Sequence, residues 1–155
     1  MTVVNLKATA SRPSIGDLVA HATEIGALVR EQAERTEADR QVSPEAVARM
    51  REAGLFRIMQ PAIYGGYEYG FDALIEAVAP VAAGCGSSGW VFSLGIVHQW
   101  LMATFPKQAQ DEVWSDPDAI AAGSYAPVGK AVAVDGGYRL SGNWSFTSGC
   151  DHAQW

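Results

Sequence analysis

The chain has 155 residues and a mass of 16.5 kDa, with 48% hydrophobic and 18% charged residues, so it can bury a core and is not a disordered segment. No apolar run reaches the ~18 residues that a membrane-spanning helix needs, and the first residues lack the pattern of a secretory signal. The net charge of −6 arises in residues 61–155, which carry three basic and nine acidic side chains. Nucleic-acid binding requires a clustered cationic face, so this balance argues against it.

The first half of the chain predicts helices. Residues 1–13 are expected to form a flexible tail, and Ser14 with Asp17 three positions later makes a capping box that begins a helix running toward Arg40. Ser43-Pro44-Glu45 combines a hydroxyl cap with proline at the first helical position, so it begins a second helix. Gly54 is the expected end of that helix.

The middle of the chain predicts three further helices. After an extended connector at 55–61 and a glycine-tyrosine loop at 64–70, residues 71–83 are apolar and helical, with Pro80 bending or ending the helix. The almost wholly apolar run 90–104 predicts a buried helix. Pro106 begins a shorter amphipathic helix that continues through Trp114.

The last forty residues predict strands. An apolar run at 119–122 is followed by residues 130–134 and 138–141, which flank Asp135-Gly136-Gly137 as in a β-hairpin. Residues 143–147 alternate again, with Trp144 and Phe146 on one side. The fold class is therefore α+β, an all-α domain of about five helices (14–117) followed by the first strands of a β-domain (118–155). These few strands lack a closing partner, so we expect an N-terminal portion of a longer protein.

Few residues carry an evident chemistry. The phosphate-binding, dinucleotide-binding and serine-hydrolase glycine motifs are all absent, and Cys85 and Cys150, 65 positions apart, indicate two reduced, buried thiols of a cytoplasmic protein rather than a metal site. His21 is expected at the surface, and His152 next to Asp151 near a strand end. His98 lies in the most apolar helix, so it is either a hydrogen-bonded core histidine or an acid/base facing a pocket. Residues 142–149 could present a flat aromatic wall with hydroxyls to a planar ligand, or simply pack on helices.

Four motifs resemble the acyl-CoA dehydrogenase superfamily, in which a helical domain precedes a flavin-holding β-domain and a C-terminal helical bundle. The similarity extends from about Ile15 to the last residue, and its last motif is the most specific. The matching pieces are Leu55-Phe56-Arg57-Ile58-Met59-Gln60-Pro61, Tyr64-Gly65-Gly66, Cys85-Gly86-Ser87-Ser88-Gly89-Trp90 and Gly142-x-Trp144-x-Phe146-x-Ser148-Gly149-Cys150-Asp151-His152.

Within the superfamily, the chain looks most like the oxygenase components of two-component flavin-dependent (group D) aromatic monooxygenases. True acyl-CoA dehydrogenases carry Thr-Glu-Pro-x-x-Gly-Ser-Asp where this chain has Tyr125-Ala126-Pro127-Val128-Gly129-Lys130, which favours the oxygenase branch. The resemblance implies reduced FMN or FAD supplied by a separate flavin reductase, and O2 activated as a C4a-hydroperoxyflavin to hydroxylate a phenol or another small aromatic substrate. It also implies a cytoplasmic homotetramer.

The resemblance implies site residues as well. Trp90 and His98 would line the substrate pocket, with His98 binding a phenolic oxygen and assisting its deprotonation. Ser148 would donate toward the N5 edge of the isoalloxazine, so His98 and Ser148 would be the catalytic residues. The other flavin contacts would come from Ser124, Tyr125, Phe146 and Thr147.

Three alternatives stay open. The first is an acyl-CoA dehydrogenase, which holds its flavin tightly and oxidises a thioester. The second is a relative of the same fold that acts on sulfur or on an amino-sugar nitrogen. The third is a non-catalytic, truncated module whose apolar faces bind a partner.

Overall fold

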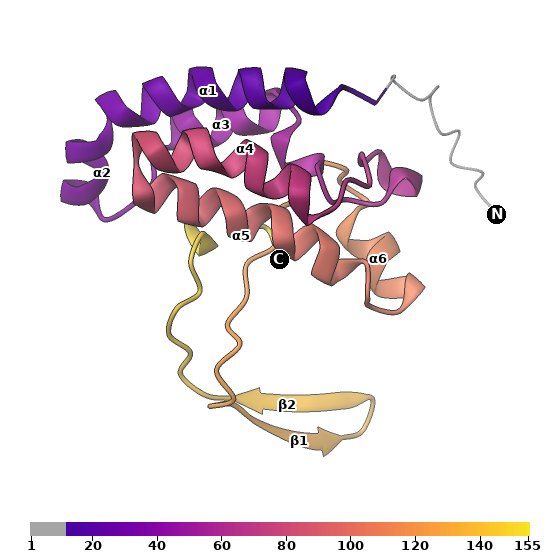
Figure 1. Ribbon diagram of the computed structural model, residues 1–155. Helices are drawn as coiled ribbons and strands as arrows, with labels where there is room; N and C mark the ends of the chain where they lie inside the picture. Colours follow the sequence, from indigo (N-terminus) through magenta and orange to yellow (C-terminus); the bar gives the residue numbers. More distant parts are fainter. Residues whose placement is uncertain (1–11) are drawn as a thin grey trace.

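A computed structural model describes residues 12–155, which form a helical body and a β-hairpin projecting from it (Figure 1). The hairpin pairs β1 with β2 antiparallel, with Lys130 opposite Ser141. This arrangement confirms the predicted α+β class. The elements are α1 (Ile15–Glu31), α2 (Ala33–Asp39), α3 (Pro44–Glu52), α4 (Phe71–Gly84), α5 (Gly86–Met102), α6 (Lys107–Val113), β1 (Lys130–Val134) and β2 (Gly137–Ser141), with 3-10 turns η1 (Leu55–Arg57), η2 (Ala62–Tyr64) and η3 (Cys150–His152).

The predicted helix starts at Ser14 and Ser43 and the predicted stop at Gly54 are confirmed. Ser14 Oγ accepts a hydrogen bond from the Asp17 amide at 3.1 Å while the Asp17 carboxylate accepts from the Ser14 amide at 3.2 Å, which is the capping box expected at the start of α1. Ser43 Oγ caps α3 by accepting a hydrogen bond from the Ala46 amide, and Pro44 occupies the first helical position. After α3, Gly54 takes a left-handed φ of +68°.

Two predictions for the body are wrong. The single helix expected from Ser14 toward Arg40 is divided at Gln32 into α1 and α2. The connector expected to be extended contains the 3-10 turn η1. The helix predicted over 71–83 is α4, which continues to Gly84, so Pro80 does not end it. Proline removes one N–H from the helix, and the carbonyl left without that donor belongs to Glu76, which is exposed and can bond to water.

Helix α5 is longer and less buried than predicted. It begins at Gly86 instead of Trp90, and the expectation of a wholly buried helix is wrong because only one side packs on α4 and the core. Phe92 and Ile96 are fully buried on that side. On the other side, Trp90 is 61% and Trp100 46% exposed.

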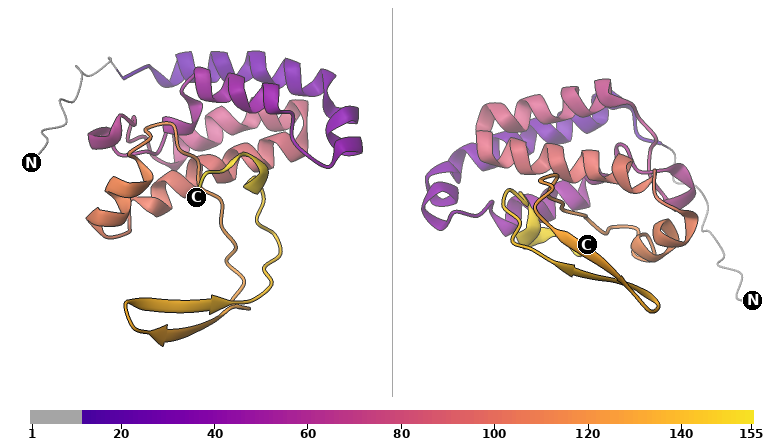
Figure 2. Two further views of the ribbon diagram at one scale, coloured as in Figure 1. Left: turned by 180° about the vertical axis from the view of Figure 1, so that it is seen from behind. Right: turned by 90° about the horizontal axis from the view of Figure 1, so that it is seen from below.

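The described residues contain two strands, not three or more. Residues 143–147 form no strand because Phe146 adopts a left-handed φ of +60°, which breaks the alternation. The run 119–122 also lacks strand assignment, yet Trp155 N donates to Ile120 O at 3.4 Å and Ala122 N donates to Trp155 O at 2.9 Å. These two bonds follow the pattern of parallel pairing. Figure 2 shows the two segments meeting at the base of the body.

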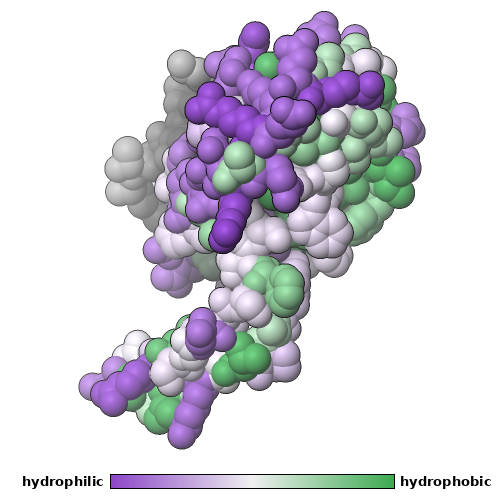
Figure 3. All heavy atoms as spheres, turned by 90° about the vertical axis from the view of Figure 1, so that its left-hand side faces the viewer, coloured by the Kyte–Doolittle hydropathy of each residue, from purple (hydrophilic) through white to green (hydrophobic). Residues whose placement is uncertain are grey.

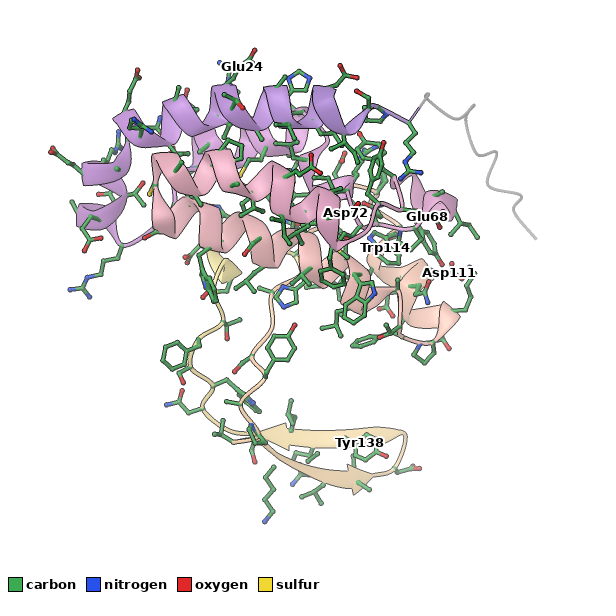
Figure 4. All side chains as sticks on the ribbon, in the orientation of Figure 1. Glu24, Glu68, Asp72, Asp111, Trp114 and Tyr138 are labelled. Carbon is green, nitrogen blue, oxygen red and sulfur yellow. The ribbon has the colours of Figure 1, made fainter. Side chains whose placement is uncertain are left out.

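The hairpin stands clear of the helices. Every residue of β1 and β2 is exposed, including Leu140 at 65% and Tyr138 at 77%, and Figure 4 shows Tyr138 on the hairpin well away from the helical body. Figure 3 shows hydrophobic side chains on the hairpin and hydrophilic side chains gathered over the end of the body formed by α2. An isolated two-stranded hairpin is marginally stable in water, so it needs a covering element.

Four predictions concern the chain as a whole. The predicted tail lies outside the described residues except Arg12 and Pro13, both of which contact Tyr69: the Arg12 guanidinium lies 3.5 Å from its ring centroid, and the Pro13 carbonyl accepts from its hydroxyl at 2.8 Å. Both cysteines are free, but the expectation that both are buried is wrong, because Cys150 is exposed. No helix of residues 12–155 is long and apolar enough to cross a membrane. The proposed boundary between residues 117 and 118 stays a prediction.

The core forms where α4 crosses α1 and packs on α5. Leu18, Ala22 and Val29 of α1 meet Ala77 and Val81 of α4, all of them almost fully buried. The backbones touch at glycines: a Cβ on Gly26 would overlap the carbonyl oxygen of Pro80. Small residues at such a crossing allow two helices to approach more closely than ordinary side chains permit.

We predict that Gly26→Ala lowers the free energy of unfolding by about 1–3 kcal/mol, because the added methyl group collides with rigid backbone. Thermal or denaturant unfolding of the protein measures this loss. The matched control is Gly16→Ala in the exposed first turn of α1, where a Cβ meets only Ser14 Oγ at 3.7 Å. Equal stability of the two variants would contradict the close crossing.

Candidate functional site

His98 is a buried histidine without a hydrogen-bond partner. Its side chain is 2% exposed, and neither Nδ1 nor Nε2 makes a hydrogen bond of ordinary geometry in residues 12–155, although the backbone of Ala121 lies close enough to interact with the ring. A polar group buried without a partner costs free energy, which is typical of a group kept for a ligand.

The surroundings of His98 keep its ring neutral. The ring of Tyr125 stacks on the imidazole at 5.9 Å between centroids and 18° between planes, and Gly123 lies beside Nε2. Burial lowers the pKa of His98 from its ordinary value, and the nearby backbone of Ala121 offsets part of this shift. At neutral pH the imidazole therefore has one nitrogen available to accept a proton.

A buried polar network holds the segment after α6 over His98. The Gln99 side chain is 1% exposed; its Nε2 donates to Ala119 O at 2.9 Å, and its Oε1 accepts from Trp114 Nε1 at 2.8 Å. Figure 4 shows Trp114 close to α6, at the end of the body away from α2. Gln99 is absent from the residues predicted from the sequence. A second polar residue beside His98, in an otherwise apolar run, is the signal that could have identified it.

The segment is fixed at two more points just before Ala119. Arg57 and Asp118 form an ion pair, with Nη2 at 2.6 Å from Oδ1. Gln60, 1% exposed, donates from Nε2 to Pro117 O at 3.1 Å and to Tyr64 O at 2.8 Å. The chain thus enters the site region on a rigid path.

Trp90 and Ser148 meet at the start of α5. Trp90 Nε1 donates to Ser148 Oγ at 3.3 Å, so the hydroxyl accepts from the indole and keeps its own proton for another acceptor. Both residues, together with Thr147, line an open groove of about 620 Å³. The groove lies between the loop after α2, the first turns of α5 and the segment that returns from the hairpin.

Ser124 and Phe146 lie on the two linkers between the hairpin and the body. The Ser124 hydroxyl donates to Ser145 O at 2.8 Å, which joins one linker to the other. Phe146 is 89% exposed and Trp144 packs on Gly129 and Gly142, so these two rings do not form the flat aromatic wall considered from the sequence.

The predicted site residues thus form three groups. Trp90, Thr147 and Ser148 share the groove, His98 stacks with Tyr125 and does not line it, and Ser124 and Phe146 lie on the hairpin linkers. The first two groups are neighbours, because Ser148 also lines a small cavity with Gly95, one turn before His98 on α5. In the described part of the chain, no three acidic, cysteine or histidine side chains gather to hold a metal ion.

Comparison with known proteins identifies the family. The model of the family "Acyl-CoA dehydrogenase, N-terminal domain" matches residues 21–119, which is more than half of the chain. The chain belongs to the acyl-CoA dehydrogenase family. The match spans α1 to α6 apart from the first turn and a half of α1, and so includes Trp90, His98 and Gln99.

Similar proteins within the family include oxygenase components. The chain is 48% identical over 139 residues to the FADH(2)-dependent resorcinol hydroxylase, oxygenase component, of Rhizobium sp. (strain MTP-10005), covering 89% of this chain and 34% of that protein. The crystal structure of the HsaA monooxygenase from M. tuberculosis superimposes with a TM-score of 0.88 at 39% identity, over 92% of this chain and 39% of that one. XiaF from Streptomyces sp., in complex with FADH2 and glycerol, gives 0.85 at 28% identity, over 90% and 35%.

These matches confirm the family resemblance inferred from the motifs. They also confirm that this chain is similar to members of the superfamily that are named as oxygenase components and monooxygenases. The chain spans about a third of the length of the curated relatives it matches.

We predict that acid destabilises the protein partly through His98. Its pKa is lowered in the folded state, so the unfolded state binds the proton more tightly, and stability falls as the pH drops below the ordinary histidine pKa of about 6.5. His98→Gln should therefore show a smaller loss of melting temperature between pH 7.5 and pH 5.5 than the parent protein. His21→Gln, at an exposed position, is the control; equal acid sensitivity in the parent and in His98→Gln would contradict the prediction.

Proposed function

We propose that this chain is the helical part and the first strands of the oxygenase component of a two-component flavin-dependent monooxygenase that hydroxylates a phenolic or other aromatic substrate. The carrying observation is the buried, neutral imidazole of His98, which makes no hydrogen bond of ordinary geometry and lies one turn along α5 from the cavity that Ser148 lines. The names of similar proteins support the same reaction class.

The residues of the groove fit reduced FMN or FAD. An isoalloxazine is planar and carries hydrogen-bonding atoms on its edge, so it needs flat contacts together with positioned hydroxyls. Ser148 has a free hydroxyl proton, since its oxygen accepts from Trp90, and Thr147 lines the same groove. In the proposed site, Ser148 and Thr147 hold the flavin edge, and Ser124, Tyr125 and Phe146, which lie outside the groove, complete the contacts from the hairpin linkers.

His98 supplies the base in this proposal. Reduced flavin, when bound, would supply the activation of O2 and the oxygen atom that is transferred to the aromatic ring of the substrate. His98 accepts the proton of the phenolic hydroxyl, which gives a phenolate and an imidazolium and makes the ring carbon ortho to the oxygen more nucleophilic. Trp90 contributes its exposed face to the substrate pocket. The packed segment around Ala121 keeps water from the imidazole.

The proposal includes partners. A separate flavin reductase supplies the reduced flavin, and O2 and a small aromatic compound are the other substrates. We propose a homotetramer in the cytoplasm, in keeping with the exposed apolar side chains of Phe71, Ile75 and Trp100 and with free cysteines.

Binding of reduced flavin tests the groove. We predict that the full-length protein binds reduced FMN or FAD in an anaerobic titration. Ser148→Ala should weaken this binding about tenfold, because one hydrogen bond between uncharged groups, held in a fixed geometry, is lost. Ser141→Ala, on the exposed end of β2, is the matched control. Unchanged affinity in Ser148→Ala would remove Ser148 from the flavin site.

The same preparation distinguishes the main alternative. An acyl-CoA dehydrogenase would purify with tightly bound oxidised flavin and reduce it with an acyl thioester. Failure of the full-length protein to bind flavin in either redox state would instead favour a non-catalytic module.

Coupling tests His98. We predict that His98→Ala, assayed with a flavin reductase and a phenolic substrate, still oxidises reduced flavin but forms about tenfold less hydroxylated product per flavin, because the phenol stays protonated. Hydrogen peroxide should account for the difference. Unchanged coupling would exclude His98 from the reaction.

A further inference from the structure

His152 makes a contact that joins two walls of the groove. One wall comes from the end of α2 and the loop after it, including Arg40, Gln41 and Val42, and the opposite wall comes from residues 147–152. His152 Nε2 lies 3.0 Å from the carbonyl oxygen of Val42, 110 positions away in sequence. Among the hydrogen bonds of residues 12–155, this is the one that connects these two walls.

The contact with Val42 determines that Nε2 of His152 carries a proton. A carbonyl oxygen only accepts, so Nε2 carries a proton and donates. Val42 is 6% exposed and His152 is half-buried, so the bond is partly buried at the edge of the groove. The bond does not involve Asp151, the neighbour considered from the sequence.

The turn between His152 and Ser148 is stiff. His152 N donates to Gly149 O at 3.0 Å, and Cys150 N donates to Thr147 O at 3.2 Å. Gly149 has a φ of +87°, where residues with a side chain are strained. A displacement of His152 therefore moves Ser148. Ser148 must stay within hydrogen-bonding distance of Trp90, which lies on the side of the groove formed by the first turns of α5.

A second anchor holds the chain beyond the turn. Gln154 N donates to Ile120 O at 2.9 Å, and Gln154 Oε1 accepts from Ile120 N at 3.0 Å. The loss of the His152 bond therefore leaves the segment attached to the body and frees the turn that carries Ser148.

We propose that His152 is a positioning residue: its bond to Val42 sets the width of the groove and holds Ser148 in place for the ligand. The inference rests on the proposed function in one respect, that the ligand is reduced flavin. The hydrogen bond between His152 and Val42, called the clamp below, is a property of the flavin-free protein.

Two amide substitutions in the full-length protein test the clamp. The Gln side chain of His152→Gln reaches as far as Nε2 and can donate to Val42 O, whereas the shorter side chain of His152→Asn cannot. His21→Asn on the exposed side of α1 is the control. The measurements are hydrogen exchange of the Cys150 and His152 amides without flavin, the anaerobic dissociation constant for reduced FMN and FAD, and the melting temperature.

We expect His152→Asn to exchange these amides about fivefold faster and to bind reduced flavin about fivefold more weakly, with His152→Gln within about twofold of the parent protein. The proposal is overturned by parental exchange in His152→Asn, by a His152→Gln variant that behaves like His152→Asn, or by faster exchange with unchanged flavin affinity. Loss of cooperative unfolding in His152→Asn also overturns it, because His152 would then be a structural residue.

The two proposals can fail separately. If the parent protein binds no reduced flavin, the proposed function is wrong while the exchange measurement still decides the clamp. Faster exchange in His152→Asn, restored in His152→Gln, would support it, and unchanged exchange would overturn it.

Discussion

The buried amide of Gln99 is the interaction on which the candidate site depends. An amide removed from water must bond at both its oxygen and its nitrogen, or about 1–3 kcal/mol is lost for each group left unpaired. Gln99 meets this demand with Trp114 on one side and Ala119 on the other. The segment after α6 is therefore held against α5, and its continuation through Ala121 to Tyr125 covers His98.

Gln99 and His98 are adjacent in sequence, yet they differ in hydrogen bonding. The amide is fully bonded, whereas both imidazole nitrogens are buried without a partner. The same packing that bonds the first excludes water from the second and lowers its pKa. The hydrogen bonds of Gln99 fix the backbone of α5 next to His98. A side chain on a fixed backbone can be held rigidly in position.

The second half of the site depends on where the chain returns after the hairpin. The hairpin contributes no burial, and both of its linkers are exposed over most of their length. Ser148 is held in place only by the turn that follows it, where hydrogen bonds of Gly149, His152 and Gln154 attach the chain to itself and to the body. A sequence motif can identify Ser148, but its partner Trp90 lies 58 positions earlier and the clamp at Val42 lies 110 positions earlier.

Local patterns in the sequence determined the helix caps at Ser14 and Ser43, the stop at Gly54, the hairpin and the family, because each depends on residues a few positions apart. They did not determine the break at Gln32 or the left-handed Phe146, where packing and solvent access override local preference. The sequence also singled out His98 and Ser148. Only the tertiary structure decided that the imidazole is unpaired under Tyr125 and that the hydroxyl bonds to Trp90, since burial and hydrogen bonding between distant segments are set by how the whole chain packs.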